Sequence, residues 1–176
     1  MNDMTLFWLM MALVFVLTII FLAIFRKKTK FEIFNDLIVI NDFVYPANIP
    51  NYVIKSISLV EKLPKVLMRS NGYGGLNTWK GVFRILGGKR ALFYVENHFK
   101  GPLIKIDTVR ESIYINFKNK EQTYQLYDDM TKNVKILDET NLSDCKFVDT
   151  KRSWVIAGIF IAIVTVVALI PAFVGF

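Results

Sequence analysis

The chain has 176 residues, of which 53% are apolar, and its 22 lysines and arginines outnumber 15 acidic residues to give a net charge of +7. A single cysteine, Cys145, excludes an internal disulfide, and a single histidine, His98, falls short of the three or four ligands of a zinc site. All 22 bases lie between two uncharged apolar runs, Thr5 to Phe25 and Trp154 to Phe176. This distribution predicts a membrane-anchored protein.

The first apolar run holds 21 residues without glycine or proline. At about 1.5 Å per residue, a helix of this length crosses a hydrocarbon core of roughly 30 Å. We expect residues 5–25 and residues 154–176 to form two transmembrane helices, because an isolated segment satisfies its backbone polar groups in lipid only as a helix. A cleaved signal peptide is the alternative for the first run, but the residues before it include Asp3 instead of bases.

The basic residues beside the two runs predict the orientation of the chain. Neither outer tail carries a base, whereas the inner flanks carry Arg26, Lys27, Lys28, Lys30, Lys151 and Arg152. Because basic flanks stay in the cytoplasm, we expect a multi-pass protein of the inner or plasma membrane, with a cytoplasmic middle segment and both termini outside. Each of these bases adds on the order of 1 kcal/mol of attraction to anionic lipid.

The middle segment opens with predicted strands, because its apolar residues mostly recur at every second position. Turn-forming Asn-Asp pairs and the proline-bounded Pro46 to Pro50 stretch separate them. The first four predicted strands are Phe31 to Phe34, Leu37 to Ile40, Val53 to Val60 and Val66 to Arg69. Their short connections favour antiparallel pairing.

A hairpin from Gly81 to Val95 follows, in which Gly87 and Gly88 supply the positive φ angles of a tight primed turn. Two more strands are predicted at Ile104 to Thr108 and Ser112 to Phe117. One amphipathic helix ends the series. Asn119 caps it, and its apolar face holds Tyr124, Tyr127, Met130 and Val134.

Strands followed by one helix predict an α+β domain at residues 26–134, with a polar tether at residues 135–152. This order resembles the bacterial pleckstrin-homology-like (PH-like) domain family over Ile33 to Lys132. The residues that carry the likeness are the Gly72-bearing RSNG loop, the Gly81-Val82-Phe83 strand start, the basic Gly87 to Arg90 turn and the last two strands.

The resemblance implies a strongly bent, seven-stranded antiparallel sheet, a partly open barrel whose open end is closed by the C-terminal helix. It also implies a binding or scaffolding role without catalysis, and it names no ligand because a fold does not fix a function.

No residue set in the sequence predicts catalysis, a cofactor or a bound metal. His98 is expected as an exposed loop residue, and Cys145 as an inert residue of the tether. The GYGG and GGKR segments fail the dinucleotide and nucleotide-loop patterns. A membrane-bound hydrolase would need a larger polar cluster than Asp107 and Glu111 supply, so we do not expect an enzyme.

Four bases gather around the predicted hairpin, interleaved with aromatic residues: Lys80, Arg84, Lys89 and Arg90. They form a candidate contact for an anion or a lipid headgroup. The alternative is a solvated hairpin whose charges discourage aggregation. Nucleic acid is not expected as a partner, because the sequence has no recognition helix, zinc pattern or RNA-binding aromatic signature.

Small residues recur along one side of the second apolar run, a pattern that lets helices approach closely in lipid: Gly158, Ala162, Thr165, Ala168 and Ala172. We expect the first run to pack there, with another copy of the chain as the alternative. The sequence thus predicts a membrane-anchored module that recognises a protein partner or an anionic lipid headgroup. The competing hypothesis is a structural subunit of a membrane transport or toxin-protection assembly, in which the apolar helices carry recognition.

Overall fold

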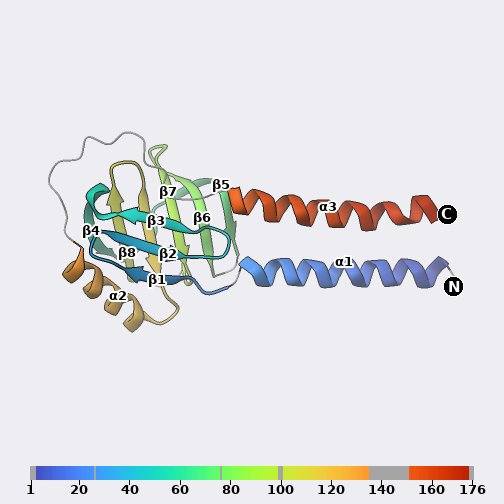
Figure 1. Cartoon of the computed structure of the whole chain (residues 1–176), viewed down its shortest axis with the longest axis horizontal. Helices are drawn as coiled ribbons and strands as arrows, with labels where there is room; N and C mark the ends of the chain where they lie inside the picture. Colours follow the sequence, from blue (N-terminus) through green and yellow to red (C-terminus); the bar gives the residue numbers. More distant parts are fainter. Residues whose placement is uncertain (1–2, 26, 76, 99–100, 135–150, 175–176) are drawn as a thin grey trace.

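The structure is a computed structural model, and it describes residues 3–25, 27–75, 77–98, 101–134 and 151–174. A β-rich body carries two helices that project from it side by side, α1 (Asp3–Phe25) and α3 (Lys151–Val174) (Figure 1). The predicted tether lies outside the described residues except for Lys151 and Arg152, which begin α3. No helix formed by the described residues has the length and apolar character needed to cross a membrane.

The smaller sheet of the body has three antiparallel strands in the order β1-β2-β3, namely β1 (Lys30–Ile33), β2 (Leu37–Asn41) and β3 (Ala47–Pro50). Reading Pro46 to Pro50 as a break between strands was wrong, because β3 occupies it. β3 is an edge strand that pairs only with β2, and its proline lies at its last position. An edge strand tolerates a residue without an N–H group, so the prolines do not prevent pairing.

The larger sheet has six strands in the order β4-β8-β9-β7-β6-β5. They are β4 (Ile54–Val60), β5 (Val66–Gly74), β6 (Trp79–Ile85), β7 (Arg90–Val95), β8 (Leu103–Thr108) and β9 (Ser112–Asn116), and a 3₁₀ turn, Asn51–Val53, precedes them. The pairs are antiparallel except for β7 with β9. The described residues therefore form nine strands in two sheets, which confirms the α+β class and replaces the expected seven-stranded antiparallel sheet.

The middle of the larger sheet is buried on both faces. On β7, Leu92 and Tyr94 enter a core shared with the smaller sheet, whereas Ala91, Phe93 and Val95 enter a second core on the other face. A strand covered on both sides needs apolar residues at every position, which accounts for the uninterrupted Ala-Leu-Phe-Tyr-Val run of β7.

Helix α2 (Lys120–Asn133) lies at the end of the body away from α1 and α3 (Figure 1). The predicted cap is confirmed, because the Asn119 side chain accepts a hydrogen bond of 3.1 Å from the backbone N–H of Glu121. The predicted face was wrong in part. Thr123, Leu126 and Met130 are the buried residues of α2, and Tyr124 is 45% exposed. The Thr123 hydroxyl accepts a hydrogen bond from the backbone N–H of residue 117, which ties this side of the helix to the chain leaving β9.

The helices α1 and α3 contact each other and the body. The rings of Phe21 and Phe160 stack with their centroids 4.2 Å apart. The Asn71 side chain of β5 donates a 2.8 Å hydrogen bond to the Ser153 hydroxyl at the start of α3. Because Phe21 and Ile24 of α1 pack against the core of the body, both helices are fastened to it close to the point where they leave it.

Candidate functional site

A pocket of about 690 Å³, here called the basic pocket, opens where the start of β4, the β6–β7 turn and the β8–β9 turn meet. Five of the side chains that line it are basic and two are acidic: Lys55, Lys89, Arg90, Lys105, Arg110, Asp107 and Glu111. Ionised, these seven groups carry a net charge of +3. A concave surface with an excess of one sign of charge concentrates the electrostatic potential, so this geometry favours an anion.

The β6–β7 turn presents the first two bases. Gly87 and Gly88 have the positive φ angles that the sequence predicts, 90° and 73°. The closing hydrogen bond runs from the Gly88 N–H to the Ile85 carbonyl at 3.0 Å, so Leu86 and Gly87 are the central residues. Because Leu86 does not have a positive φ, the turn is not of the primed type expected. It places Lys89 and Arg90 at the start of β7, beside the pocket.

The β8–β9 turn supplies the opposite wall and is held by one hydroxyl group. The Thr108 hydroxyl donates to the Glu111 carbonyl at 2.7 Å and accepts from the N–H groups of Arg110 and Glu111 at 3.3 and 3.1 Å. These bonds fix the backbone beneath the two charged side chains. The parallel pairing of Ala91 with Ser112 sets Arg90 next to Glu111.

The two acids of the basic pocket differ in how they are compensated. Burial opposes ionisation of Asp107, but the Lys105 ammonium at 2.6 Å and the Ser112 hydroxyl at 2.6 Å outweigh it and lower its pKa. Burial raises the pKa of Glu111 against the attraction of Arg90 and Arg110. Its side chain is 4% exposed, and its Oε2 accepts no hydrogen bond from the described residues and lies 3.7 Å from Arg90 Nε.

The predicted anion contacts separate into two places. Lys89 and Arg90 line the basic pocket, and the exposed Arg84 pairs with Arg90 across the β6–β7 ladder. Lys80 is only 2% exposed and lies in the interior, where its ammonium forms an ion pair with Asp42 at 2.7 Å. An ammonium enclosed in this way is a structural group, not a contact for an external anion.

The Lys80–Asp42 pair joins three parts of the chain. Asp42 also accepts hydrogen bonds from the Thr29 hydroxyl at 2.7 Å and from the N–H groups of Val44 and Tyr45 at 3.0 Å each. Lys80 donates a further hydrogen bond to the Lys27 carbonyl, in the segment that leaves α1. Burial alone would raise the pKa of Asp42, but the charge and hydrogen bond of Lys80, with the other donors, hold it below its usual value.

Sequence reasoning missed three bases of the basic pocket, namely Lys55, Lys105 and Arg110. They come from β4, β8 and the β8–β9 turn, which the order of the larger sheet brings near the hairpin. The alternation of Lys105 and Asp107 with Ile104 and Ile106 is the one local signal that the two charged side chains share a face of β8.

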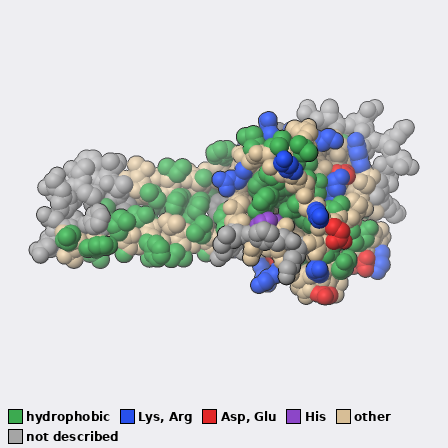
Figure 2. Space-filling view, turned by 180° about the vertical axis from the view of Figure 1, so that it is seen from behind, with side chains coloured by type: hydrophobic (Ala, Val, Ile, Leu, Met, Phe, Trp, Pro, Cys, Tyr) green, Lys and Arg blue, Asp and Glu red, His purple; other side chains and the backbone are tan. Residues whose placement is uncertain are grey.

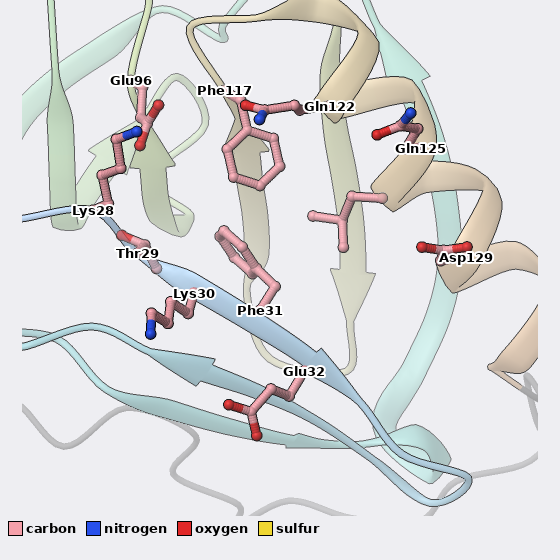
Figure 3. Close-up of a pocket in the computed structure, with 11 residues that line it drawn as sticks. Lys28, Thr29, Lys30, Phe31, Glu32, Glu96, Phe117, Gln122, Gln125 and Asp129 are labelled. Atoms are coloured by element: carbon pink, nitrogen blue, oxygen red, sulfur yellow. The ribbon is translucent and has the colours of Figure 1, made fainter.

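A second pocket, of about 480 Å³, lies between β1 and α2 and adjoins the segment that follows α1 (Figure 3). Figure 3 shows Lys28 beside Glu96, with Phe31 and Phe117 inside the pocket; their ring centroids are 5.5 Å apart. The charged residues of its lining are two bases and three acids: Lys28, Lys30, Glu32, Glu96 and Asp129. This balance does not favour an anion.

The remaining predicted residues lie outside both pockets or outside the described residues. Lys151 and Arg152 are exposed at the start of α3, Lys27 lies over the ring of Phe43, and Arg26 is not described. His98 is half-buried instead of exposed, because it stacks on Trp79 with centroids 5.0 Å apart. Among the described residues, no group of three or more His, Cys, Asp or Glu side chains is placed to hold a metal ion.

The small residues of α3 do not face α1 where they are described. Gly158, Ala162 and Thr165 are exposed, and a Cβ atom added at Gly158 would meet nothing within 4 Å. Phe160 is the residue that stacks on α1. The side chains of Ala168 and Ala172 lie outside the described residues.

Comparison with known proteins identifies the body. A family model described as a bacterial PH domain matches residues 29–127, which are 99 of the 176 residues and run from the segment before β1 into α2. All the residues that line the basic pocket fall within this match. Neither a curated protein nor a solved structure matches the chain.

Proposed function

We propose a function from the premise that this chain belongs to the bacterial PH domain family. PH-like domains are generally binding modules without catalytic activity. The proposed function is a membrane-anchored module that binds an anionic segment of a partner protein in the basic pocket, at the cytoplasmic face of the membrane. The observation that carries it is the net charge of +3 on the lining of this pocket, which two turns of defined geometry and the strands β4 and β8 present.

Membrane anchoring is supported by the surface of α1 and α3. Large apolar side chains lie exposed along both helices, including Trp8, Phe15, Trp154 and Ile161. Figure 2 shows apolar side chains along the two helices, whereas lysine and arginine side chains are gathered on the body. Exposed apolar surface of this extent is typical of contact with a membrane or a partner.

The length of the runs agrees with this proposal. The apolar runs of the sequence hold 21 and 23 residues, and a span needs roughly 20. The basic flanks favour the cytoplasmic placement of the body.

A protein ligand is favoured over a lipid headgroup by the place of the basic pocket. Lys80, which is bonded to the segment leaving α1, and Ile85, which lines the pocket, lie near opposite ends of β6. Five residues of strand cover about 17 Å. The pocket is therefore removed from the point where the chain leaves α1, and it remains open to the surroundings of the body.

Titration of the full chain in detergent micelles tests this assignment. The probes are an octaglutamate peptide and glycerophosphoglycerol, a soluble headgroup, with calorimetric detection. We expect salt-dependent binding of the peptide that falls at least tenfold in the double variant Lys89→Glu/Arg90→Glu. The matched control is Lys118→Glu/Lys120→Glu, which makes the same charge change at exposed positions away from the basic pocket.

Three outcomes of this titration contradict the assignment. Peptide binding that survives in the pocket variant, or is equally reduced in the control, contradicts the assignment of the basic pocket. Binding of glycerophosphoglycerol without binding of the peptide assigns the pocket to a lipid headgroup instead.

The second candidate function is a structural subunit of a membrane transport or toxin-protection assembly. It is favoured by the outward position of Gly158, Ala162 and Thr165, which leaves this side of α3 open to another helix. Replacing both apolar helices by unrelated spans and isolating bound proteins separates the candidates. Loss of the partner after this exchange supports recognition by the helices, and retention supports the body.

A further inference from the structure

The β2–β3 turn, residues 42–46, lies on the side of the body from which α1 and α3 project (Figure 1). β1 leads away from α1, so the antiparallel strand β2 returns toward it, and Asn41 pairs with Lys30. The turn between β1 and β2, residues 34–36, lies at the opposite end of the same sheet. Only the first of these two turns is adjacent to the apolar helices.

One residue of the β2–β3 turn is held outward while its neighbours are buried. Asp42, Val44 and Tyr45 are all less than 5% exposed, whereas Phe43 is 49% exposed. The Asp42 carboxylate fixes this arrangement by accepting the N–H groups of Val44 and Tyr45, and it is itself fixed by Lys80. The ring of Phe43 is therefore presented by a rigid turn instead of a mobile loop.

A base accompanies the exposed ring. The Lys27 ammonium lies 4.6 Å from the centroid of the Phe43 ring, within the range of a cation–π contact. The backbone of Lys27 is fixed because its carbonyl accepts a hydrogen bond from Lys80. Lys27 also follows the last residue of α1 by only two positions, so it lies at the depth where an apolar helix would meet the headgroups.

An apolar ring with an ammonium beside it matches the boundary between acyl chains and phosphates. The ring lies among glycerol and the first methylenes, and the cation lies with the phosphates. Continuity with α1 makes the bilayer the occupant of this surface, because any other partner would have to replace lipid at the base of the helix.

We infer that the β2–β3 turn is a third membrane contact, in which Phe43 enters the interface of the leaflet that α1 and α3 cross. This inference rests on the proposed membrane anchoring. A contact of the body itself with the membrane, in addition to its two helices, restricts how the body tilts on them. The body then keeps one orientation relative to the membrane.

Depth-dependent quenching of a fluorophore tests the inference in full-length chain reconstituted into vesicles of phosphatidylcholine and phosphatidylglycerol. Single cysteines are introduced in a Cys145→Ser background and labelled with an environment-sensitive dye. The test variant is Phe43→Cys. The matched control is Phe34→Cys, because Phe34 is 50% exposed and lies in the β1–β2 turn at the far end of the sheet. Phe15→Cys, in the exposed surface of α1, reports on the anchor itself.

We expect lipids that carry a nitroxide near the headgroup to quench the dye at position 43 several-fold more strongly than at position 34. The dye at position 15 should be quenched best by nitroxides deep in the acyl chain. Strong quenching at position 15 with equal or no quenching at positions 43 and 34 overturns the inference and leaves the anchoring intact. Absence of quenching at position 15 overturns the anchoring as well. A thermal melt of each labelled variant shows that it is folded.

Discussion

Replacing Lys80 by methionine tests the view that this residue is structural. The two side chains of the Lys80–Asp42 pair are 3% and 2% exposed, so the variant leaves a carboxylate in the interior without its counter-charge. Removing one partner of a buried ion pair costs about 3–5 kcal/mol. Asp42 keeps the Thr29 hydroxyl and two backbone N–H donors, so we expect a loss near 3 kcal/mol in the free energy of unfolding. Lys62→Met, the same change at an exposed lysine, should alter it by less than about 0.5 kcal/mol.

Urea unfolding of the full chain in mild detergent, followed by tryptophan fluorescence, measures both free energies. Lys80→Met/Asp42→Asn should recover part of the loss, because the double variant leaves no unpaired charge. The pH dependence gives a second check. The pKa of Asp42 is lowered in the fold, so its contribution is present above the unfolded value of 3.8 and is lost as pH falls through the folded value. Without Lys80 the folded pKa rises, and the deficit of the variant should shrink as Asp42 becomes protonated. The reasoning would be refuted if Lys80→Met lost no more free energy of unfolding than Lys62→Met at pH 7, or if its loss did not change on acidification.

Four further substitutions have outcomes set by the structure. Glu111→Gln should raise the melting temperature at pH 7, because burial raises the pKa of Glu111 and disfavours its ionised form. The gain in melting temperature should vanish below about pH 4.5, where the carboxyl group is protonated in both the folded and the unfolded state. A gain that persists in acid contradicts this reasoning. Gly81→Ala should lower the free energy of unfolding in urea by about 2–5 kcal/mol, because φ is +103° and the added Cβ atom would lie 2.5 Å from the Asn71 carbonyl oxygen. Gly88→Ala should lower it by only about 1–2 kcal/mol, because φ is +73° but the added Cβ atom would meet nothing within 4 Å. Asn119→Ala removes the cap of α2 and should lower the free energy of unfolding by about 1 kcal/mol, and an unchanged urea midpoint would show that the cap contributes nothing.

Periodicity located most strands because a half-buried strand alternates its side chains, as the later part of β8 does. It failed where backbone contacts decide the structure. β5 was predicted to end at Arg69, but it continues to Gly74 through a polar, glycine-containing segment that reads as a loop. Gly72 pairs with Gly81 in the β5–β6 ladder, and neither position has room for a side chain. A Cβ atom at Gly81 would lie 2.6 Å from the Cα of Gly72, and one at Gly72 would lie 2.7 Å from the Lys80 carbonyl oxygen. The sequence shows two glycines, and only the fold shows that the two strands leave no space for a side chain at either position.

The role of Lys80 was predicted wrongly for a related reason. A base beside Trp79 in a hairpin resembles a surface anion contact, and its partner Asp42 is 38 residues away. A local signal existed, because Lys80 is two positions from the buried Val82 on β6 and therefore shares its face. The signal is ambiguous, since Arg84 has the same parity and is exposed. The depth of a strand residue depends on what covers that part of the sheet, which the sequence of one strand does not contain.

The two projecting helices are fastened to adjacent strands, the segment after α1 to β6 and the start of α3 to β5. The segment after α1 is tied to β6 by the hydrogen bond from Lys80 to the Lys27 carbonyl, and the start of α3 is tied to β5 by the bonds between Asn71 and Ser153. Asn71 pairs directly with Val82, so the ties lie two residues apart along one ladder. A change in the spacing of the helices would strain this ladder, and β6 continues from it to the turn that presents Lys89 and Arg90. One strand therefore joins the two places: β6 holds Lys80 beneath α1 at one end and leads to the basic pocket at the other.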